Sequence, residues 1–446
     1  MAKTNVAARN TRKTAEGGPA LPQGKPETEL RRAVSACLLW ENGFYESGEE
    51  IAERIRKLVG QCSPQFVADL AVQARDEYKL RHAPLWLLAC MMSPNRKPME
   101  GLDGRISDVI RRADEPGELI SLFSKAWPKA RRTEGGTKDA VRLPAAFKRG
   151  IATALGKFDA YQLGKYNRKA EFSLKDVIRL VHPRNAERSP VWKKLIDGEL
   201  ESPDTWEVAL SGGADKKATF ERLITEGKLG YLALLRNLRK MAEVGVDTAI
   251  IREAIIARKG AGNVLPFRYV AAAKAAPQFE PFLDEALCAS IDEMKTLPGE
   301  TIVLVDVSPS MGSQLSGKSD MTRMIAAATL ASIIPGKIRV FTFDENVREI
   351  APRKGMAGVD AILRVQGYST MLGKAVARVN LEKHDRLIVI TDEETADVVP
   401  NPVAKNAYMI NVAQAKNSVG YGPWTRITGF SENVLRYIAE HEHQEG

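Results

Sequence analysis

Two aspartates and several hydroxyl residues have the types and the spacing of a divalent-metal site. In chain order they are Asp306, Ser308, Ser310, Ser369, Thr370 and Asp392. The first three form a D-x-S-x-S motif directly after an apolar run, and the last follows a second apolar run. Carboxylate and hydroxyl oxygens are hard ligands, which suit Mg²⁺ or Mn²⁺. With only two carboxylates, such a site leaves the metal able to accept a carboxylate from a partner protein or a phosphate oxygen from RNA.

The elements around these residues alternate between strand and helix. Strands are expected at 301–307, 338–343, 387–391 and 407–412, and helices at 321–334, 371–379 and 432–441, the last capped by Ser431. This alternation predicts a doubly wound parallel sheet, whose ligand site lies at the carboxyl ends of the strands. The alternative is that Asp306 and Asp392 are strand-end residues that only cap neighbouring helices.

The first two thirds of the chain are expected to be helical. Apolar residues recur at helical spacing in 66–79, 85–92, 229–241, 250–257 and 281–294, and no convincing strand precedes residue 300. Helix pairs with short loops favour an α-solenoid or a ring of degenerate helical repeats. We therefore divide the chain into a disordered basic tail (1–28), a helical domain (29–297) and an α/β domain (299–446).

The charge of the chain favours a polyanionic partner for the helical part. Net charge is +9, but residues 299–446 hold 16 Lys and Arg against 17 Asp and Glu, so the positive excess lies before them. Four well-separated cysteines, without a C-x-x-C, argue against a disulfide framework or a zinc site and favour the cytoplasm. No signal peptide, apolar transmembrane run or other membrane association is expected.

One stretch, 165–183, combines cations with aromatic residues. Its basic residues are Lys165, Arg168, Lys169, Lys175 and Arg179, and its aromatic residues are Tyr166, Phe172 and His182. Such cations neutralise phosphates, and the aromatic rings stack on unpaired bases. The alternative is a solvated helix face with Phe172 and Leu174 in the core, and for His182 the alternative is a histidine that ends a helix.

This stretch, together with "YLALLRNLRKM" (231–241) and "VLPFRYVAAAK" (264–274), resembles the TROVE domain of the Ro autoantigen family. The compact chain and basic tail resemble bacterial members. The D-x-S-x-S motif, the later threonine and the Thr-Asp pair resemble the metal-ion-dependent adhesion site of von Willebrand factor A domains.

The resemblance implies a HEAT-like helical ring followed by a von Willebrand factor A domain that closes it. Small structured Y RNA is expected on the outside of the ring, and 3′ ends of misfolded RNA in its hole. An exoribonuclease tethered by Y RNA is the expected partner enzyme. Family contacts fall on Lys165, Lys169 and His182, and Lys169 stands where vertebrate members have the bidentate Arg.

The same resemblance makes Asp306, Ser308, Ser310, Thr370 and Asp392 the metal ligands, with Ser369 as the alternative to Thr370. Catalysis is not expected, because two carboxylates among hydroxyls do not form a two-metal centre and the chain lacks a Walker loop or a nucleophile elbow. The competing function is a protein adaptor that binds a partner carboxylate at the metal.

Overall fold

A computed structural model describes residues 25–35, 48–93, 98–128, 131–132, 140–201, 204–211, 213, 215–315, 321–413, 423–428 and 433–445. The chain forms two compact units. One comprises Ala52–Thr219, and the other joins the residues up to Ile51 with Phe220–Gly446. Among the described residues, no helix is both long enough and apolar enough to cross a membrane.

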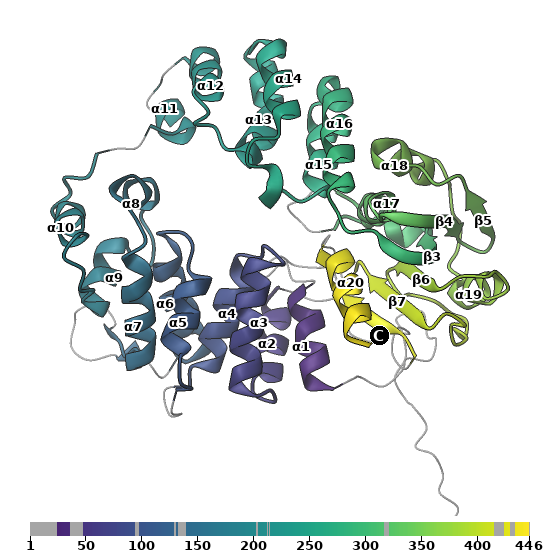
Figure 1. Ribbon diagram of the computed structural model, residues 1–446, viewed down its shortest axis with the longest axis horizontal. Coiled ribbons are helices and arrows are strands. Elements are labelled where there is room, and N and C mark those ends of the chain that lie inside the picture. Colours follow the sequence, from purple (N-terminus) through teal and green to yellow (C-terminus); the bar gives the residue numbers. More distant parts are fainter. Residues whose placement is uncertain are drawn as a thin grey trace, which may run out of the picture. The chain divides into compact units, whose positions relative to one another are not determined.

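The unit 52–219 is built almost wholly of helices (Figure 1). They are α2 (Gly48–Val59), α3 (Pro64–Asp76), α4 (His82–Met91), α5 (Leu102–Val109), α6 (Glu115–Ala126), α7 (Ala145–Leu155), α8 (Ala160–Tyr166), α9 (Leu174–Val181), α10 (Ser189–Asp197) and α11 (Trp206–Ser211). Helix α4 is central, since all but its two end residues are buried. Helices α5 and α7 lie so close that a Cβ at Gly150 would come within 2.6 Å of Ile106.

Two antiparallel strands of two residues each, β1 (Arg131–Arg132) and β2 (Ala140–Val141), interrupt the helices of this unit. The expectation that no strand precedes residue 300 is wrong at this point. Strands of two residues carry no detectable alternation of apolar and polar residues, so the pattern that identifies longer strands is absent.

The other unit begins with helices. They are α1 (Pro26–Ser35), α12 (Lys216–Thr225), α13 (Tyr231–Glu243), α14 (Thr248–Ala257), α15 (Phe267–Ala275) and α16 (Glu280–Asp292), with short 3₁₀ turns at Ala261–Asn263 and Pro277–Phe279. Helices α13 to α16 pack through buried tyrosines, and the Tyr231 hydroxyl donates to the Ile255 carbonyl at 2.7 Å. Periodicity alone had identified α13, α14 and α16 in this group.

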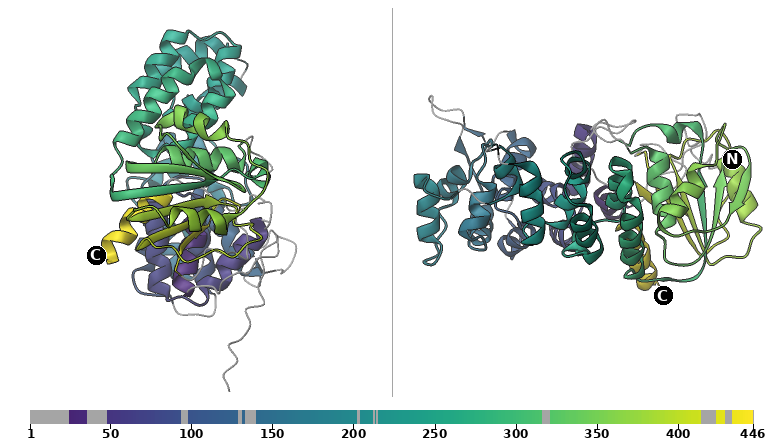
Figure 2. Two further views of the ribbon diagram at one scale, coloured as in Figure 1. Left: turned by 90° about the vertical axis from the view of Figure 1, so that its right-hand side faces the viewer. Right: turned by 90° about the horizontal axis from the view of Figure 1, so that it is seen from above.

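A sheet of six strands follows, with helices on both faces (Figures 1 and 2). Its strands are β3 (Leu297–Asp306), β4 (Gly336–Phe343), β5 (Val347–Ile350), β6 (Arg386–Thr391), β7 (Asn406–Asn411) and β8 (Thr425–Thr428). The order is β5-β4-β3-β6-β7-β8, and every neighbouring pair is parallel except β4 with β5. The predicted fold class, helical repeats followed by a doubly wound parallel sheet, is confirmed.

Four helices accompany the sheet: α17 (Arg323–Ser332), α18 (Gly355–Leu363), α19 (Leu372–Val379) and α20 (Asn433–Glu445). Helix α19 packs on one face, against Leu304, Phe343 and Val389 among others. On the strands, side chains alternate between faces, so Thr301 and Arg386 belong to the other face, where Arg386 pairs with Glu442 of α20. Sequence patterns missed the short β5, β8 and α18, and the expected cap Ser431 lies outside the described residues.

Strand register brings the carboxyl ends of β3 and β6 together. Val303 is paired with Ile388, and Val305 with Ile390. Asp306 and Asp392, which come at the ends of these neighbouring parallel strands, therefore reach the same edge of the sheet. This edge also receives the loops that follow β4 and precede α19.

Candidate functional site

Asp306 is fully buried at the end of β3 and organises the D-x-S-x-S loop. Its Oδ1 accepts a hydrogen bond from the Ser308 backbone N–H at 2.9 Å, and its Oδ2 accepts one from the Thr391 hydroxyl at 2.6 Å. The Ser308 and Ser310 hydroxyl oxygens lie 3.1 Å apart. The structure therefore brings the three residues of the motif together, with their oxygens in one small region.

Asp392 is equally buried and contacts a cation that the sequence analysis did not single out. Arg323, in the first turn of α17, donates to Asp392 Oδ2 at 3.2 Å, and the same nitrogen lies 3.5 Å from the Ser310 carbonyl oxygen. The Arg323 side chain is 2% exposed. The available sequence signal was Arg323 itself, which begins the otherwise apolar segment "RMIAAATLA". An arginine buried with such a segment requires a charged partner.

The loop that carries Ser369 and Thr370 is fixed by Asp344, a second residue that sequence reasoning missed. Asp344 Oδ2 accepts from the Tyr368 backbone N–H at 3.3 Å, and its carbonyl accepts from the Met371 N–H at 3.0 Å. A Cβ at Gly367 would lie 2.1 Å from the Val307 carbonyl oxygen, so this loop packs directly on the D-x-S-x-S loop.

Ser369 and Thr370 are both partly buried, and the Thr370 carbonyl accepts from the Thr395 hydroxyl at 3.5 Å. That contact involves the backbone, so it does not distinguish Thr370 from Ser369 as a ligand. Among the described residues, no three His, Cys, Asp or Glu side chains form a group able to hold a metal. Any metal at this edge therefore depends on hydroxyl ligands.

Negative charge accumulates at this edge. Burial and the neighbouring charge of Asp392 raise the pKa of Asp306 from 3.8 to about 7. The hydrogen bonds from Ser308 and Thr391 act in the opposite direction but are outweighed. A bound cation next to both carboxylates would remove this penalty on the ionised form.

The raised pKa of Asp306 predicts a pH-dependent stability of the metal-free protein. Between about pH 4 and pH 7 the folded state holds a proton that the unfolded state has lost, so stability falls as pH rises. Asp306→Asn carries no such charge. The free energy of unfolding of Asp306→Asn, relative to that of wild type, should therefore rise by roughly 2–4 kcal/mol from pH 5 to pH 8. Chemical denaturation in EDTA measures this difference. The exposed Asp360→Asn is the control, and a difference independent of pH would contradict the prediction.

The predicted RNA-binding residues lie on α8, α9 and the loop between them. Lys165 is partly buried, whereas Arg168, Lys169, Arg179 and His182 are exposed. The two acids in this stretch have structural roles. Asp176 completes the capping box of α9 with Ser173, and Glu171 accepts from the Ser121 hydroxyl.

Lys175, by contrast, is tied to the fold. Its ammonium donates to the Ile196 carbonyl at 2.6 Å and so joins α9 to the end of α10. It belongs with the packing of this unit more than with its surface. The Tyr166 ring contacts two arginines. The Arg112 guanidinium lies 4.6 Å from the centre of the ring, and the Arg168 guanidinium lies 5.8 Å from it.

His182 ends α9 in the left-handed conformation, with φ of 48°. A side chain at this φ costs about 1 kcal/mol relative to glycine, the usual residue at such a position. His182 therefore occupies a helix end, the position that the alternative interpretation gave it, and its side chain is exposed. The location does not exclude an RNA contact, because the His182 side chain is exposed.

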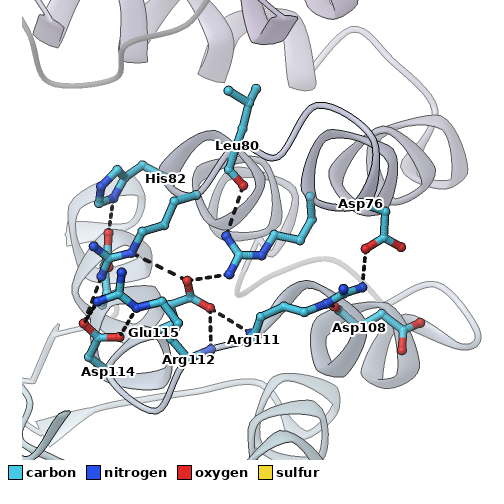
Figure 3. Close-up of polar contacts among 11 residues, drawn as sticks. Asp76, Leu80, His82, Asp108, Arg111, Arg112, Asp114 and Glu115 are labelled. Carbon is cyan, nitrogen blue, oxygen red and sulfur yellow. Dashed lines mark hydrogen bonds and ion pairs between the residues drawn. The ribbon is translucent and has the colours of Figure 1, made fainter. Parts of the chain in front are cut away.

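Figure 3 shows an ion cluster around Glu115 at the start of α6. Glu115, fully buried at the start of α6, accepts from Arg75 at 2.7 Å and from the Arg111 and Arg112 backbone N–H groups at 2.8 and 3.0 Å. Arg81 donates to Asp114 at 3.0 Å and to Glu118 at 2.9 Å. The cluster therefore joins the end of α3 and the start of α4 to the start of α6.

Glu118 also contacts His82. Burial acts to raise the pKa of Glu118, but the hydrogen bond and charge of His82, with Arg81 and Arg112, leave that pKa below its ordinary value. The carboxylate is therefore ionised at neutral pH. Nothing in the sequence spacing of these residues, which come from three helices, had indicated the cluster.

A family model for the TROVE domain matches residues 33–197 and 193–263, just over half of the chain. The chain belongs to the TROVE-domain family. The members of this family are RNA-binding proteins. The basic stretch 165–183 lies inside the matched region, whereas the sheet and its metal-site residues lie after it.

The TROVE-domain chain resembles a solved structure and a curated protein. It matches the crystal structure of the Deinococcus radiodurans RO (RSR) protein with a TM-score of 0.62 and 19% identity, over 94% of this chain and 100% of that one. At this identity the match establishes the shared fold. It is also similar to telomerase protein component 1 of Mus musculus, with 21% identity over 270 residues, 42% of this chain but 10% of that protein.

Proposed function

We propose that this protein binds small structured non-coding RNA of the Y type through Lys165, Arg168, Lys169, Arg179 and His182. The observation that carries the proposal is the exposure of the last four on one short segment, α8 to the end of α9, while the acids of that segment support the fold. Exposed cations beside a histidine can contact several successive phosphates. Membership of the TROVE family supports RNA as the polyanion.

We further propose that single-stranded 3′ ends of misfolded RNA are a second ligand and that a 3′–5′ exoribonuclease, tethered by Y RNA, is the partner enzyme. The protein would act in RNA maturation, quality control and decay in the cytoplasm. It would position RNA without cleaving it. Incubation of purified protein with RNA and Mn²⁺ should leave the RNA intact, and cleavage lost in Asp306→Asn would contradict this.

The RNA proposal is tested by purifying tagged protein from its native host and sequencing the RNA that accompanies it. One abundant small structured RNA should be recovered with wild type. It should be lost from the Lys165→Ala/Lys169→Ala/His182→Ser variant and retained by Lys383→Ala/Lys405→Ala, which removes two exposed lysines from the sheet domain. No enriched RNA, or equal enrichment in both variants, would contradict the proposal.

For the sheet domain we propose a site for Mg²⁺ or Mn²⁺ held by Asp306, Ser308, Ser310, Thr370 and Asp392. The residues fit such an ion, since their oxygens gather at one edge, and burial together with the neighbouring Asp392 charge raises the pKa of Asp306, which a bound cation would oppose. The metal would supply an electrophilic centre for an incoming carboxylate or phosphate oxygen. Arg323 partly neutralises Asp392, so it would have to share that carboxylate with the metal.

Asp306→Asn should abolish Mn²⁺ binding measured by titration calorimetry, because it removes a buried charged ligand. RNA affinity should change less than about twofold, since the basic segment, residues 165–183, lies in the unit 52–219 and Asp306 does not. Asp360→Asn, an exposed substitution in the same domain, should bind Mn²⁺ like wild type. Equal binding by all three proteins would show that the metal does not use Asp306.

The alternative function is an adaptor that binds a partner protein through this metal. The hydroxyl-rich ligand set favours it, because a weakly neutralised metal retains affinity for an external carboxylate. EDTA would release such a partner, whereas RNA bound to the basic segment would be released by salt. The two responses separate the functions even if one molecule performs both.

A further inference from the structure

A pocket lies beside the basic segment, between the start of α6 and the loop that joins α8 to α9. Its volume is about 310 Å³, close to the lower end of the range for ligand pockets. Asp114, Gly117, Glu118 and Ser121 form one wall, and the segment from Arg168 to Phe172 forms the opposite wall with Tyr166. All of these residues belong to the unit 52–219, so the pocket is a feature of that unit alone.

The charges around the pocket favour a neutral polar ligand. Two of its carboxylates, Asp114 and Glu118, are compensated by Arg112, Arg81 and His82. A third lining carboxylate, Glu171, accepts a hydrogen bond from the Ser121 hydroxyl. A phosphate inside would face these carboxylates, and a cation would find Asp114 and Glu118 already paired. The proposed phosphate contacts are instead Arg168 and Lys169, which line the pocket and are exposed to solvent.

Two aromatic residues line the pocket, and one of its carboxylates is able to accept further hydrogen bonds. Tyr166 and Phe172 line it, and aromatic rings stack on nucleobases without regard to sequence. Glu118 Oε1 is hydrogen-bonded to His82 and Oε2 accepts a hydrogen bond from Arg81, and each carboxylate oxygen has two lone pairs. Glu118 is therefore able to accept further hydrogen bonds from amino groups of a ligand.

We propose that this pocket binds an unpaired nucleobase carrying an amino group, whose flanking phosphates lie on Arg168 and Lys169. This inference rests on the proposed RNA-binding function and adds base selectivity to it. Adenine, cytosine and guanine each carry an amino group that can donate hydrogen bonds to the carboxylates. Uracil presents one N–H between two carbonyl oxygens, which the carboxylates repel. The pocket therefore selects adenine and cytosine against uracil.

The test is the affinity of the full-length protein for oligonucleotides of adenylate, cytidylate and uridylate of equal length. Wild type should bind the first two about tenfold more tightly than the last. Ala170→Trp, on the exposed loop, and Ser121→Leu, on α6, should each fill the pocket and remove this preference. Ser121→Ala leaves the pocket open and should keep the preference, so it is the matched control.

Lys169→Ala separates the pocket from general RNA binding, because it should weaken all three oligonucleotides by a similar factor. Equal affinity of wild type for the three, unchanged by Ala170→Trp, would overturn the pocket proposal and leave the RNA-binding function standing. No measurable binding of wild type to these oligonucleotides or to structured RNA would overturn both. Competition by free arginine, lost in Ala170→Trp, would assign the pocket to a cationic ligand and also overturn the proposal.

Discussion

The Lys165→Ala/Lys169→Ala/His182→Ser variant is expected to bind structured RNA about 100-fold more weakly than wild type at physiological salt. In the proposed complex the two lysines would each contribute a phosphate contact with release of a counterion, and the exposed ring of His182 would contribute a hydrogen bond. None of the three side chains is fully buried, so the substitutions should leave the fold intact.

Salt dependence distinguishes this explanation from a general loss of structure. A plot of log affinity against log salt concentration should lose about two units of slope in the variant, roughly one for each lysine. The Lys383→Ala/Lys405→Ala protein has lost the same number of lysines and should keep the wild-type slope. An unchanged slope in the triple variant would mean that these residues do not contact phosphate.

Glu115→Ala is expected to destabilise the unit 52–219 by about 3–5 kcal/mol. The substitution leaves the Arg75 guanidinium, 12% exposed, without its 2.7 Å carboxylate partner, and it also removes the acceptor for the Arg111 and Arg112 N–H groups. Burial already lowers the pKa of Arg75 despite the opposing charge of Glu115. Without that carboxylate, the unfavourable free energy of burying the Arg75 cation is no longer offset by Glu115.

Amide hydrogen exchange would measure this effect where it occurs. Protection should fall in α3, α4 and α6, which the cluster joins, and remain unchanged in the strands β3 and β6 of the sheet domain. The control is Glu53→Ala, which breaks the exposed pair with Arg56 and should cost at most about 1 kcal/mol. Equal protection in Glu115→Ala and Glu53→Ala would show that the cluster does not stabilise this unit.

The helices and parallel strands were predictable because their signals are local. Apolar residues at helical spacing located α3, α13 and α14, and continuous β-branched runs located β3 and β6. The rule that parallel strands place ligands at their carboxyl ends then brought Asp306 and Asp392 to one edge, as strand register confirms. The shorter β1, β2, β5 and β8 escaped because a few residues carry too little pattern.

The sequence by itself determined the fold class, in which helical repeats precede a parallel sheet, the family, and the residues whose types suit RNA and metal. Only the tertiary structure decided which charges neutralise one another. The buried pair Arg323–Asp392, the Glu115 cluster and the pocket beside Tyr166 each join residues from separate helices or strands. The physical reason is that burial, which makes a charge require a partner, is set by packing between elements distant in sequence, whereas the patterns visible in the sequence report only on neighbours along the chain.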